Sequence, residues 1–466
     1  MKRLLALLLL AAPVLAADSK PDVLFIAVDD LNDWTSYLGG HPQARTPNID
    51  RLVARGTAFT NSHCAAPACN PSRAALMSGI RPWETGIYTN GDPAQGVLKD
   101  VTTINRHFLA NGYHTLGGGK IYHGFSSEGR DDTWTKWAGL FPSIKQHEEN
   151  MNGLKRGHFD WGPVDAKPSE MGDYKATDWA INELKTAPTD KPLFLALGYI
   201  KPHLPWYVPR EYFDRFPLKD IKLPLTKEDD LDDVPAMGKK MAGPDGDHAS
   251  VLMGDQWKKG VQAYLATISF LDDQVGRLLD GLDQSPRKDK TIIVWWTDHG
   301  WHLGEKEHWR KFALWEDATR TSMAIVAPGV TTPGTRSAAP VDYMNMYPTI
   351  CELTGLPVPE HVKGASLMPL LKDPAAEWKG VAVCTHGKGN HAVCDDNWRY
   401  IRYSDGSEEL YDHSKDPNEW TNVAGEVGMS DIKTRLGAVL PQAEVPSTSG
   451  EKKKGGGKAK KKKAEK

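Results

Sequence analysis

A cysteine at the start of a helix-like segment is the first residue in this sequence with an evident chemical use. Residues 64–79 read CAAPACNPSRAALMSG, and the whole chain of 466 residues has five cysteines. Pro71 and Arg73 follow Cys69 closely, and the run that they open is typical of a helix. Because a helix N-terminus favours negative charge, Cys69 is placed to face an anion as a nucleophile. The alternative is a disulfide between Cys64 and Cys69.

Two polar pairs follow predicted strands. Asp29 and Asp30 end the segment AVDD, and Asp298 and His299 end the segment WWTDH. Because ligands gather at the carboxyl ends of parallel strands, we expect the two pairs to meet at one edge of a sheet. Neighbouring carboxylates repel unless a cation lies between them, and calcium or magnesium is the natural partner of such oxygen ligands. His299 is a softer ligand than calcium usually takes, so the sequence predicts a divalent metal without fixing which one.

Lysines and histidines gather just past the predicted strand ends. They are Lys120 and His123 in GGGKIYHG, His203 in GYIKPHLPW, and Lys306, His308 and Lys311 in GEKEHWRKF. Taken singly, each lysine is usually a solvated surface charge and each histidine a structural group. Together with Arg73 and a metal they indicate a pocket for a small anion with several oxygens, which means sulfate or phosphate.

The elements that must position these residues alternate along the chain. Strands are predicted for residues 22–28, 191–200 and 290–297, which are short apolar runs. Helices are predicted for residues 47–56 and for 261–282, where apolar residues recur at helical spacing. This alternation predicts an α/β fold with a mostly parallel sheet covered by helices on both faces.

The two ends differ from the rest in composition. Residues 1–17 combine Lys2 and Arg3 with a short apolar run and small residues, which predicts a signal peptide and an exported protein. No later segment is long and apolar enough to predict a membrane span. Residues 446–466 are predicted to be a disordered Lys-rich tail. Removing the +7 of the last 16 residues and the +2 of the signal peptide from the total of -3 leaves about -12. A body of that charge argues against nucleic-acid binding.

Several motifs resemble the sulfatase family. The segment CNPSR matches the family signature Cys-x-Pro-Ser-Arg, whose cysteine is converted after synthesis to the aldehyde formylglycine. Other segments resemble sulfatase segments in family order: VLFIAVDDL, TPNIDRLVARGTAFTNSHC, GKIYHG, KPHLPW, TDHGWHLGEKEHWRK and ELYDHSKDPNEWTNVAG. Many arylsulfatases have Asp-Asn in place of Asp298-His299 and a closer spacing than that of Lys120 and His123. These departures make the chain most similar to iduronate-2-sulfatase and its bacterial relatives.

The resemblance implies an alkaline-phosphatase-like fold. It assigns residues 18–350 to a catalytic domain with a large mixed sheet flanked by helices, and residues 351–445 to a smaller C-terminal subdomain. It also implies one calcium ion with these ligands: Asp29, Asp30, Cys69, Asp298 and His299. Cys384 and Cys394 lie near the position of a C-terminal disulfide in the iduronate-2-sulfatase group, which makes them a candidate pair.

The mechanism that the resemblance implies is hydrolysis of a sulfate ester. One hydroxyl of the hydrated aldehyde at position 69 attacks sulfur, and loss of the other hydroxyl's proton then expels sulfate and restores the aldehyde. Arg73 and Lys120 are expected to orient the hydrate, and His123 to remove the second proton.

The remaining expected residues contact the substrate, a sulfated carbohydrate. His203 and Lys311 are expected to grip the sulfate ester, and one of them to protonate the departing sugar oxygen. Trp301 and His308 are expected to contact the sugar, and the alternative for Trp301 is a buried structural position. The other implied partner is the formylglycine-generating enzyme that converts Cys69.

Two other functions stay open at this point. One is a phosphodiesterase or phosphonate monoester hydrolase, because such enzymes share the fold and the metal site at the edge of the sheet. The other is a non-catalytic glycan-binding protein that never receives the modification. Activity ratios on sulfate and phosphate esters, and the chemical state of position 69, distinguish the three.

Overall fold

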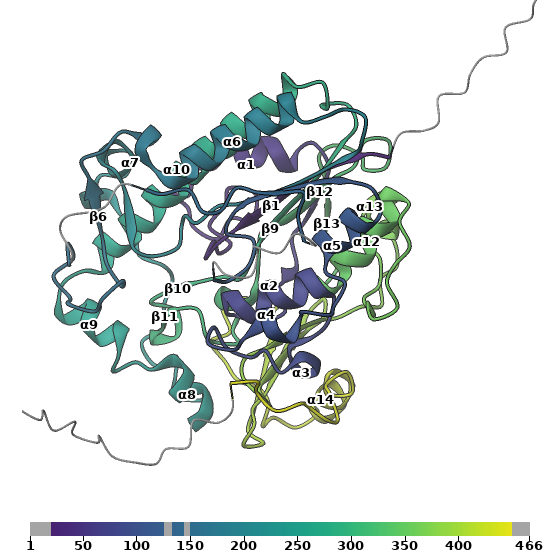
Figure 1. Cartoon of the computed structure of the whole chain (residues 1–466). Coiled ribbons are helices and arrows are strands. Elements are labelled where there is room, and N and C mark those ends of the chain that lie inside the picture. The colour runs from purple at the N-terminus through teal and green to yellow at the C-terminus, as the bar shows by residue number, and fades with distance from the viewer. Residues whose placement is uncertain (1–19, 125–132, 144–149, 450–466) are drawn as a thin grey trace, which may run out of the picture.

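The centre of the computed structural model is an eight-stranded mixed sheet (Figure 1). The structure describes residues 20–124, 133–143 and 150–449. From edge to edge the strands are β13 (Thr335–Ser337), β2 (Thr57–Phe59), β12 (Met323–Val326), β9 (Thr291–Thr297), β1 (Asp22–Val28), β7 (Leu193–Gly198), β4 (His114–Gly119) and β5 (Lys136–Trp137). Strand β12 runs antiparallel to β2 and β9, and the other neighbours are parallel. The predicted α/β class and mixed sheet are confirmed.

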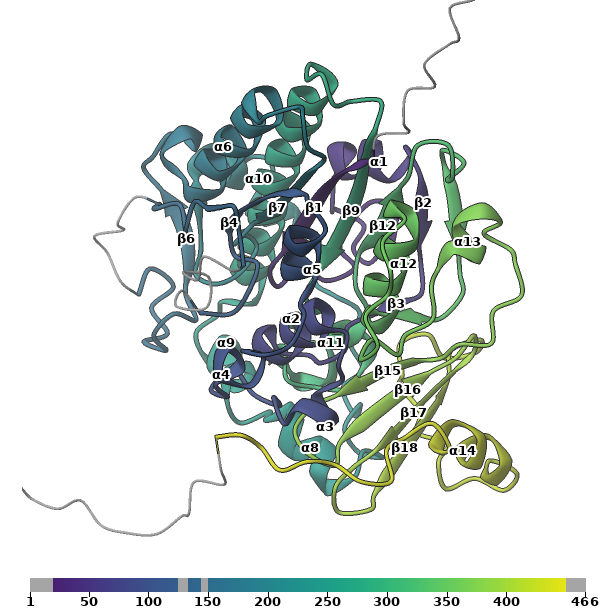
Figure 2. The same ribbon diagram turned by 45° about the vertical axis from the view of Figure 1, so that its right-hand side comes forward.

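Strand β1 is apolar on both faces because helices cover both faces of the sheet (Figures 1 and 2). Alternate side chains beginning with Leu24 pack in one core cluster with α1 (Pro47–Val53), α6 (Gly172–Thr186) and α10 (Trp257–Asp283). The side chains beginning with Val23 pack in the other cluster with α2 (Cys69–Ser78), α5 (Ile104–Ala110) and α12 (Met346–Thr354). Burial of each such side chain contributes about 1.5–3 kcal/mol. Strand β1 is thereby fixed in register, and with it the residues that follow its carboxyl end.

A second, four-stranded antiparallel sheet lies beside the main body (Figure 2). Its strands are β15 (Ala382–Thr385), β16 (His391–Cys394), β17 (Trp398–Arg402) and β18 (Glu408–Asp412). One face packs on α14 (Ser430–Gly437) and the other belongs to the core cluster of the main sheet. The C-terminal sheet subdomain expected from the sequence is therefore present. The predicted boundary after residue 350 falls within α12.

The predicted signal peptide, residues 1–17, lies outside the described residues. Of the predicted tail, residues 446–466, the structure describes residues 446–449. The backbone N–H of Thr448 donates to the Gly86 carbonyl at 3.1 Å, and that of Ser449 donates to Asp92 Oδ1 at 2.9 Å. Within the described part of the chain, no helix has the length and apolar character that a membrane crossing requires.

Candidate active site

The carboxyl ends of β1 and β9 lie side by side because the two strands pair in parallel. Val28 is the register partner of Thr297, so the polar pairs that follow them meet at the same edge of the sheet. One ligand atom from each of five residues lies within 4.8 Å of the others: Asp29, Asp30, Cys69, Asp298 and His299. All five side chains are buried. The structure thus brings together the complete set that the sequence predicted as metal ligands.

The backbone at Asp30 is held in an unusual conformation. Its φ of 62° is left-handed, which costs on the order of 1–3 kcal/mol for a residue other than glycine. The Tyr264 hydroxyl, from α10, donates to the Asp30 carbonyl at 2.7 Å and accepts from the Asn32 N–H at 3.0 Å. The Asp30 N–H donates to Asp298 Oδ1 at 3.0 Å. Sequence reasoning missed Tyr264, because helical spacing places it on the buried face of α10 without revealing what its hydroxyl contacts.

Cys69 is the first residue of α2, directly after the extended Ala68. Its thiol donates to Asp29 Oδ1 at 3.4 Å, and its Sγ atom lies 3.5 Å from His299 Nε2 and 2.9 Å from Lys311 Nζ. Burial, followed by the charge of Asp29, raises the pKa of the Cys69 thiol well above its ordinary value. The unmodified thiol is therefore protonated at neutral pH and is a poor nucleophile.

Arg73 lies one helical turn after Cys69 and is fully buried. Its Nε atom donates to Asp298 Oδ2 at 2.9 Å, and its Nη2 atom lies 3.4 Å from Asp29 Oδ1. Nη1 donates to the Ile121 carbonyl at 3.2 Å. Arg73 therefore links the ends of β1 and β9 to the segment that follows β4. Removing one partner of such a buried ion pair typically costs about 3–5 kcal/mol.

Two lysines pair with the buried carboxylates beside position 69. Lys120 follows β4, pairs through Nζ with Asp29 Oδ2, and lies 3.8 Å from Cys69 Sγ. Lys311 Nζ donates to Asp30 Oδ1 at 2.6 Å from the loop after β11 (Trp309–Arg310). Both ammonium groups therefore flank position 69.

Burial and the neighbouring charges shift the pKa values of the carboxylates in this cluster in different directions. Burial opposes ionisation of Asp29, but Lys120 and the other cations outweigh it and hold the pKa well below the ordinary range. Burial raises the pKa of Asp298 to about 7, assisted by the charges of Asp29 and Asp30 and opposed by Arg73. At Asp298, burial therefore outweighs the ion pair with Arg73.

His203 and His123 lie at the outer side of the cluster. His203 Nε2 is 3.8 Å from Asp30 Oδ2, and the ring is one-quarter exposed. Both histidines line a cavity of about 290 Å³ together with Lys120. Burial, followed for His123 by the charge of Lys120, lowers the pKa of each ring to about 4. Both rings are therefore neutral at pH 7.

Three predicted residues do not face this cavity. Trp301 is 2% exposed, and its ring lies 5.5 Å from Lys311 Nζ and 6.0 Å from the ring of Trp206. The expectation that Trp301 packs on a sugar is corrected to a buried core position. His308 has both ring nitrogens 2.7 Å from main-chain carbonyls, one of them that of Lys311, so its polar atoms are engaged with the loop and do not face the cavity. Lys306 pairs with Asp230 at 2.7 Å, away from the cluster.

The cysteines depart from both disulfides considered from the sequence. All five thiols are free and buried. Cys64 Sγ lies 3.6 Å from Cys384 Sγ, and not against Cys69. Cys384 pairs in register with Ala392 on the neighbouring strand, so the expected pairing of Cys384 with Cys394 is wrong in this structure.

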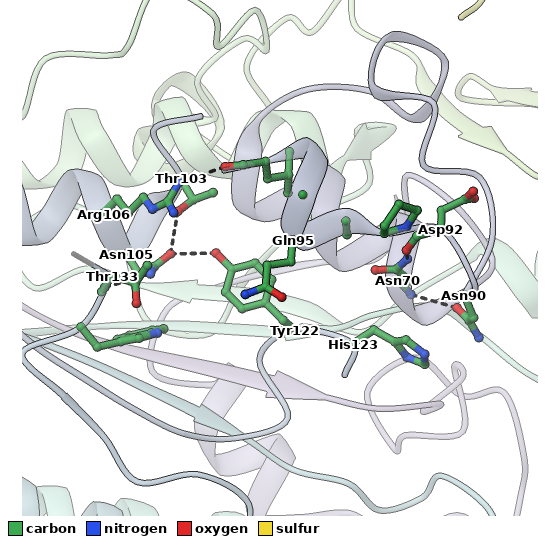
Figure 3. A pocket seen from close by; sticks show the side chains of 15 residues that line it. Asn70, Asn90, Asp92, Gln95, Thr103, Asn105, Arg106, Tyr122, His123 and Thr133 are labelled. Carbon is green, nitrogen blue, oxygen red and sulfur yellow. Dashed lines mark hydrogen bonds between the residues drawn. The ribbon is translucent and has the colours of Figure 1, made fainter. Parts of the chain in front are cut away.

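A second cavity of about 290 Å³ opens beside α2 (Figure 3). It lies between α4 (Ala94–Val97) and the segment after β4, with Tyr122 near its middle and Asn70 and His123 toward one end. The Asn70 N–H donates to Asn90 Oδ1 at 3.0 Å, and the Tyr122 hydroxyl donates to Asn105 Oδ1 at 2.8 Å. The lining is rich in amide side chains, and His123 is shared with the cavity over Lys120. A hydroxyl-rich molecule fits a lining of this kind.

Comparison with known families and structures agrees with this geometry. The Sulfatase family model matches residues 21–356, and the model for the C-terminal part of N-sulphoglucosamine sulphohydrolase matches residues 304–445. A solved structure of BT4656 in complex with its substrate D-glucosamine-2-N,6-O-disulfate superposes with a TM-score of 0.70 at 22% identity, covering 91% of this chain and 97% of that chain. Phosphonate monoester hydrolase from Silicibacter pomeroyi superposes with a TM-score of 0.73 at 21% identity, covering 90% and 94%. These two likenesses establish the alkaline-phosphatase-like fold.

Sequence relatives are closer than these structures. A protein named sulfatase from Formosa agariphila is 39% identical over 447 residues, covering 91% of this chain and 87% of the relative. Human iduronate 2-sulfatase is 32% identical over 385 residues, covering 72% of this chain and 70% of the relative. The chain therefore belongs to the sulfatase family of sulfuric ester hydrolases.

Proposed function

We propose that this sulfatase removes sulfate from a sulfated carbohydrate, with formylglycine formed at Cys69 as the nucleophile and a calcium ion as the Lewis acid. The observation that carries the proposal is the position of Cys69. It begins a helix, lies within 4.8 Å of the ligand atoms of three carboxylates and one histidine, and is flanked by two lysines. We further propose that residues 1–17 direct export.

The residues present fit a hard divalent cation. Three carboxylates converge, and Oδ2 of Asp30 is buried without a hydrogen-bond partner among the described residues. An orphaned buried carboxylate oxygen is costly unless a cation takes it up. The ligands would be Asp29, Asp30, Asp298, His299 and the modified residue 69. When bound, calcium would withdraw charge from a sulfate oxygen and make the ester easier to attack.

The side chains around position 69 divide the remaining work. Arg73 and Lys120 would hold the hydrated aldehyde in place, and His123, which is neutral at pH 7, would accept a proton from it. His203 is also neutral at pH 7, whereas burial of Lys311 is outweighed by Asp30 and the other carboxylates, which raise the pKa of Lys311. Lys311 would therefore carry the proton that passes to the departing sugar oxygen. Lys311 and His203 would together orient the sulfate group.

Burial of the signature sets the order of maturation. Cys69 and Arg73 are completely buried, and Pro71 between them is buried as well. A formylglycine-generating enzyme cannot reach these side chains in the folded protein. The proposed conversion of Cys69 therefore takes place before α2 docks on the sheet.

The substrate class follows from the surroundings of position 69 and from the relatives. Human iduronate 2-sulfatase and the sulfated glucosamine complex support a sulfated sugar. The amide-rich cavity beside α2 would bind sugar hydroxyls next to the cavity that receives sulfate. A sugar of the iduronate-2-sulfate type is the specific proposal.

The test is a substrate panel with the mature protein carrying formylglycine. Release of sulfate from 2-O-sulfated uronic acid disaccharides and from 6-O-sulfated glucosamine would be measured in parallel with release of the alcohol from a phosphodiester and a phosphonate monoester. The proposal predicts a higher kcat/KM on the two sulfated sugars than on the two phosphorus esters. Among the sulfated sugars, it predicts a higher kcat/KM on the uronic acid 2-sulfate. A higher kcat/KM on the phosphonate or phosphodiester would support the hydrolase alternative on the same fold.

A further inference from the structure

A second cluster of metal-ligating side chains lies where the C-terminal sheet meets the main body. His63 ends β3 (Ser62–His63), Glu316 begins α11 (Glu316–Thr319), and Cys394 ends β16. One ligand atom from each of these three residues lies within 4.8 Å of the other two. Glu316 also belongs to a second group of the same tightness with His413 and Glu419. Three distant segments of the chain thus converge on Glu316.

The imidazoles are oriented as metal ligands are. His63 Nε2 lies 2.7 Å from Asn61 Oδ1, while its Nδ1 is buried and has no hydrogen-bond partner among the described residues. His413 Nε2 lies 2.8 Å from Glu419 Oε1, and Cys394 is among the groups that act on the same ring. Ligating histidines typically donate their outer N–H to a carboxylate or carbonyl oxygen, which fixes the inner nitrogen toward the metal.

We propose that His63, Glu316, Cys394 and His413 bind a structural zinc ion. A thiolate, two imidazoles and a carboxylate form a four-coordinate set of the kind that zinc prefers, whereas the active-site carboxylates form a set suited to calcium. Cys394 and His63 are 2% and 1% exposed, so the ion would be enclosed by protein.

The neighbouring charges accommodate a divalent ion. Arg399 pairs with Oε2 of Glu316 and with Oε1 of Glu419, which neutralises part of the acidic charge. The other oxygen of Glu316 forms a longer ion pair with Arg320 Nε at 3.7 Å, and Arg320 would share that oxygen with the ion. Arg399 and Glu419 would then act as the outer partners that orient the ligands.

The site would tie the C-terminal sheet to the catalytic core. Cys394 and His413 come from the sheet region, while His63 and Glu316 come from the main body. Helix α11 also accepts the backbone N–H of Gly300 at the Ala318 carbonyl, at 2.9 Å, directly after His299. Zinc would therefore stabilise the element that lies behind the proposed calcium ligands.

The test uses the full mature chain carrying Cys69→Ser, which removes the thiol from the active site. Zinc is measured by mass spectrometry after exhaustive dialysis, and cobalt is then substituted to record the thiolate-to-cobalt charge-transfer band. We expect one zinc per chain and a thiolate band, both lost with Cys394→Ser and at least tenfold reduced with His63→Gln. Cys384→Ser is the matched control, because Cys384 is a buried thiol of the same sheet outside the cluster, and it is expected to keep both signals.

Three results would overturn the proposal. They are a Cys69→Ser protein that binds no zinc and gives no thiolate band, a His63→Gln protein that keeps both signals, and alkylation under denaturing conditions that finds Cys394 in a disulfide. If Cys394→Ser fails to fold by circular dichroism, the His63→Gln protein decides the outcome, because Gln can still hydrogen-bond to Asn61. Failure here leaves the sulfatase proposal untouched, since no active-site residue is involved in the readout.

Discussion

Replacing Tyr264 by phenylalanine removes one oxygen atom that holds the turn at Asp30. The hydroxyl donates to the Asp30 carbonyl at 2.7 Å and accepts from the Asn32 N–H at 3.0 Å, and all three groups are buried. The variant leaves one buried acceptor and one buried donor unpaired. At about 1–3 kcal/mol for each of the two buried groups left unsatisfied, we expect the free energy of unfolding to fall by roughly 2–6 kcal/mol. We also expect lower kcat, because the left-handed backbone that aims the Asp30 carboxylate is no longer fixed.

Tyr199→Phe is the matched control. The Tyr199 hydroxyl is also buried and hydrogen-bonds to the Thr177 hydroxyl at 3.0 Å, and neither residue belongs to the metal cluster. Urea unfolding and hydrolysis of a chromogenic aryl sulfate over a calcium titration would be measured for both variants. Tyr264→Phe should need more calcium for half-maximal activity, whereas Tyr199→Phe should lose stability alone. Equal calcium dependence in the two variants would refute the positioning role of Tyr264.

Three further predictions concern the charged cluster. Chelation of the purified protein with EGTA should abolish activity and lower Tm, because at a calcium concentration of 100 Kd the ion contributes about 2.7 kcal/mol; unchanged Tm would contradict a resident cation. The acid limb of the kcat profile should lie near pH 4 and not near pH 6.5, because burial and Lys120 depress the pKa of His123 and only the neutral ring accepts a proton; a limb that His123→Ala leaves in place would exclude His123 as the base. Arg73→Met should lower the free energy of unfolding by about 3–5 kcal/mol in chemical denaturation, because it leaves Asp298 buried without its partner; a loss below 1 kcal/mol would contradict the bridging role.

The edge of the sheet where the site lies could be predicted because polar residues directly follow two apolar strand-like runs. Apolar runs at 22–28 and 290–297 are strands buried on both faces. Because the two strands pair in parallel, the polar residues that follow them lie at the same edge of the sheet. The spacing of apolar residues predicts a helix over 261–282, and in the structure this helix extends from Trp257 to Asp283. A short continuous apolar run indicates each strand, and the spacing of apolar residues indicates the helix.

Contacts between side chains distant in sequence could not be predicted in the same way. His308 and Trp301 follow a strand end closely, yet the loop turns back so that one ring contacts main-chain carbonyls and the other enters the core. Cys384 and Cys394 have a spacing that allows pairing, but the strand register places Cys384 opposite Ala392. Such outcomes depend on loop path and register, which local patterns do not encode.

The most direct test of the account is mass spectrometry of the peptide that contains residue 69, from protein coexpressed with a formylglycine-generating enzyme and matched to the activity of the same sample. The account predicts the aldehyde at position 69 and a specific activity proportional to its fraction. Full activity on a sulfated sugar with an unmodified Cys69 thiol would contradict it.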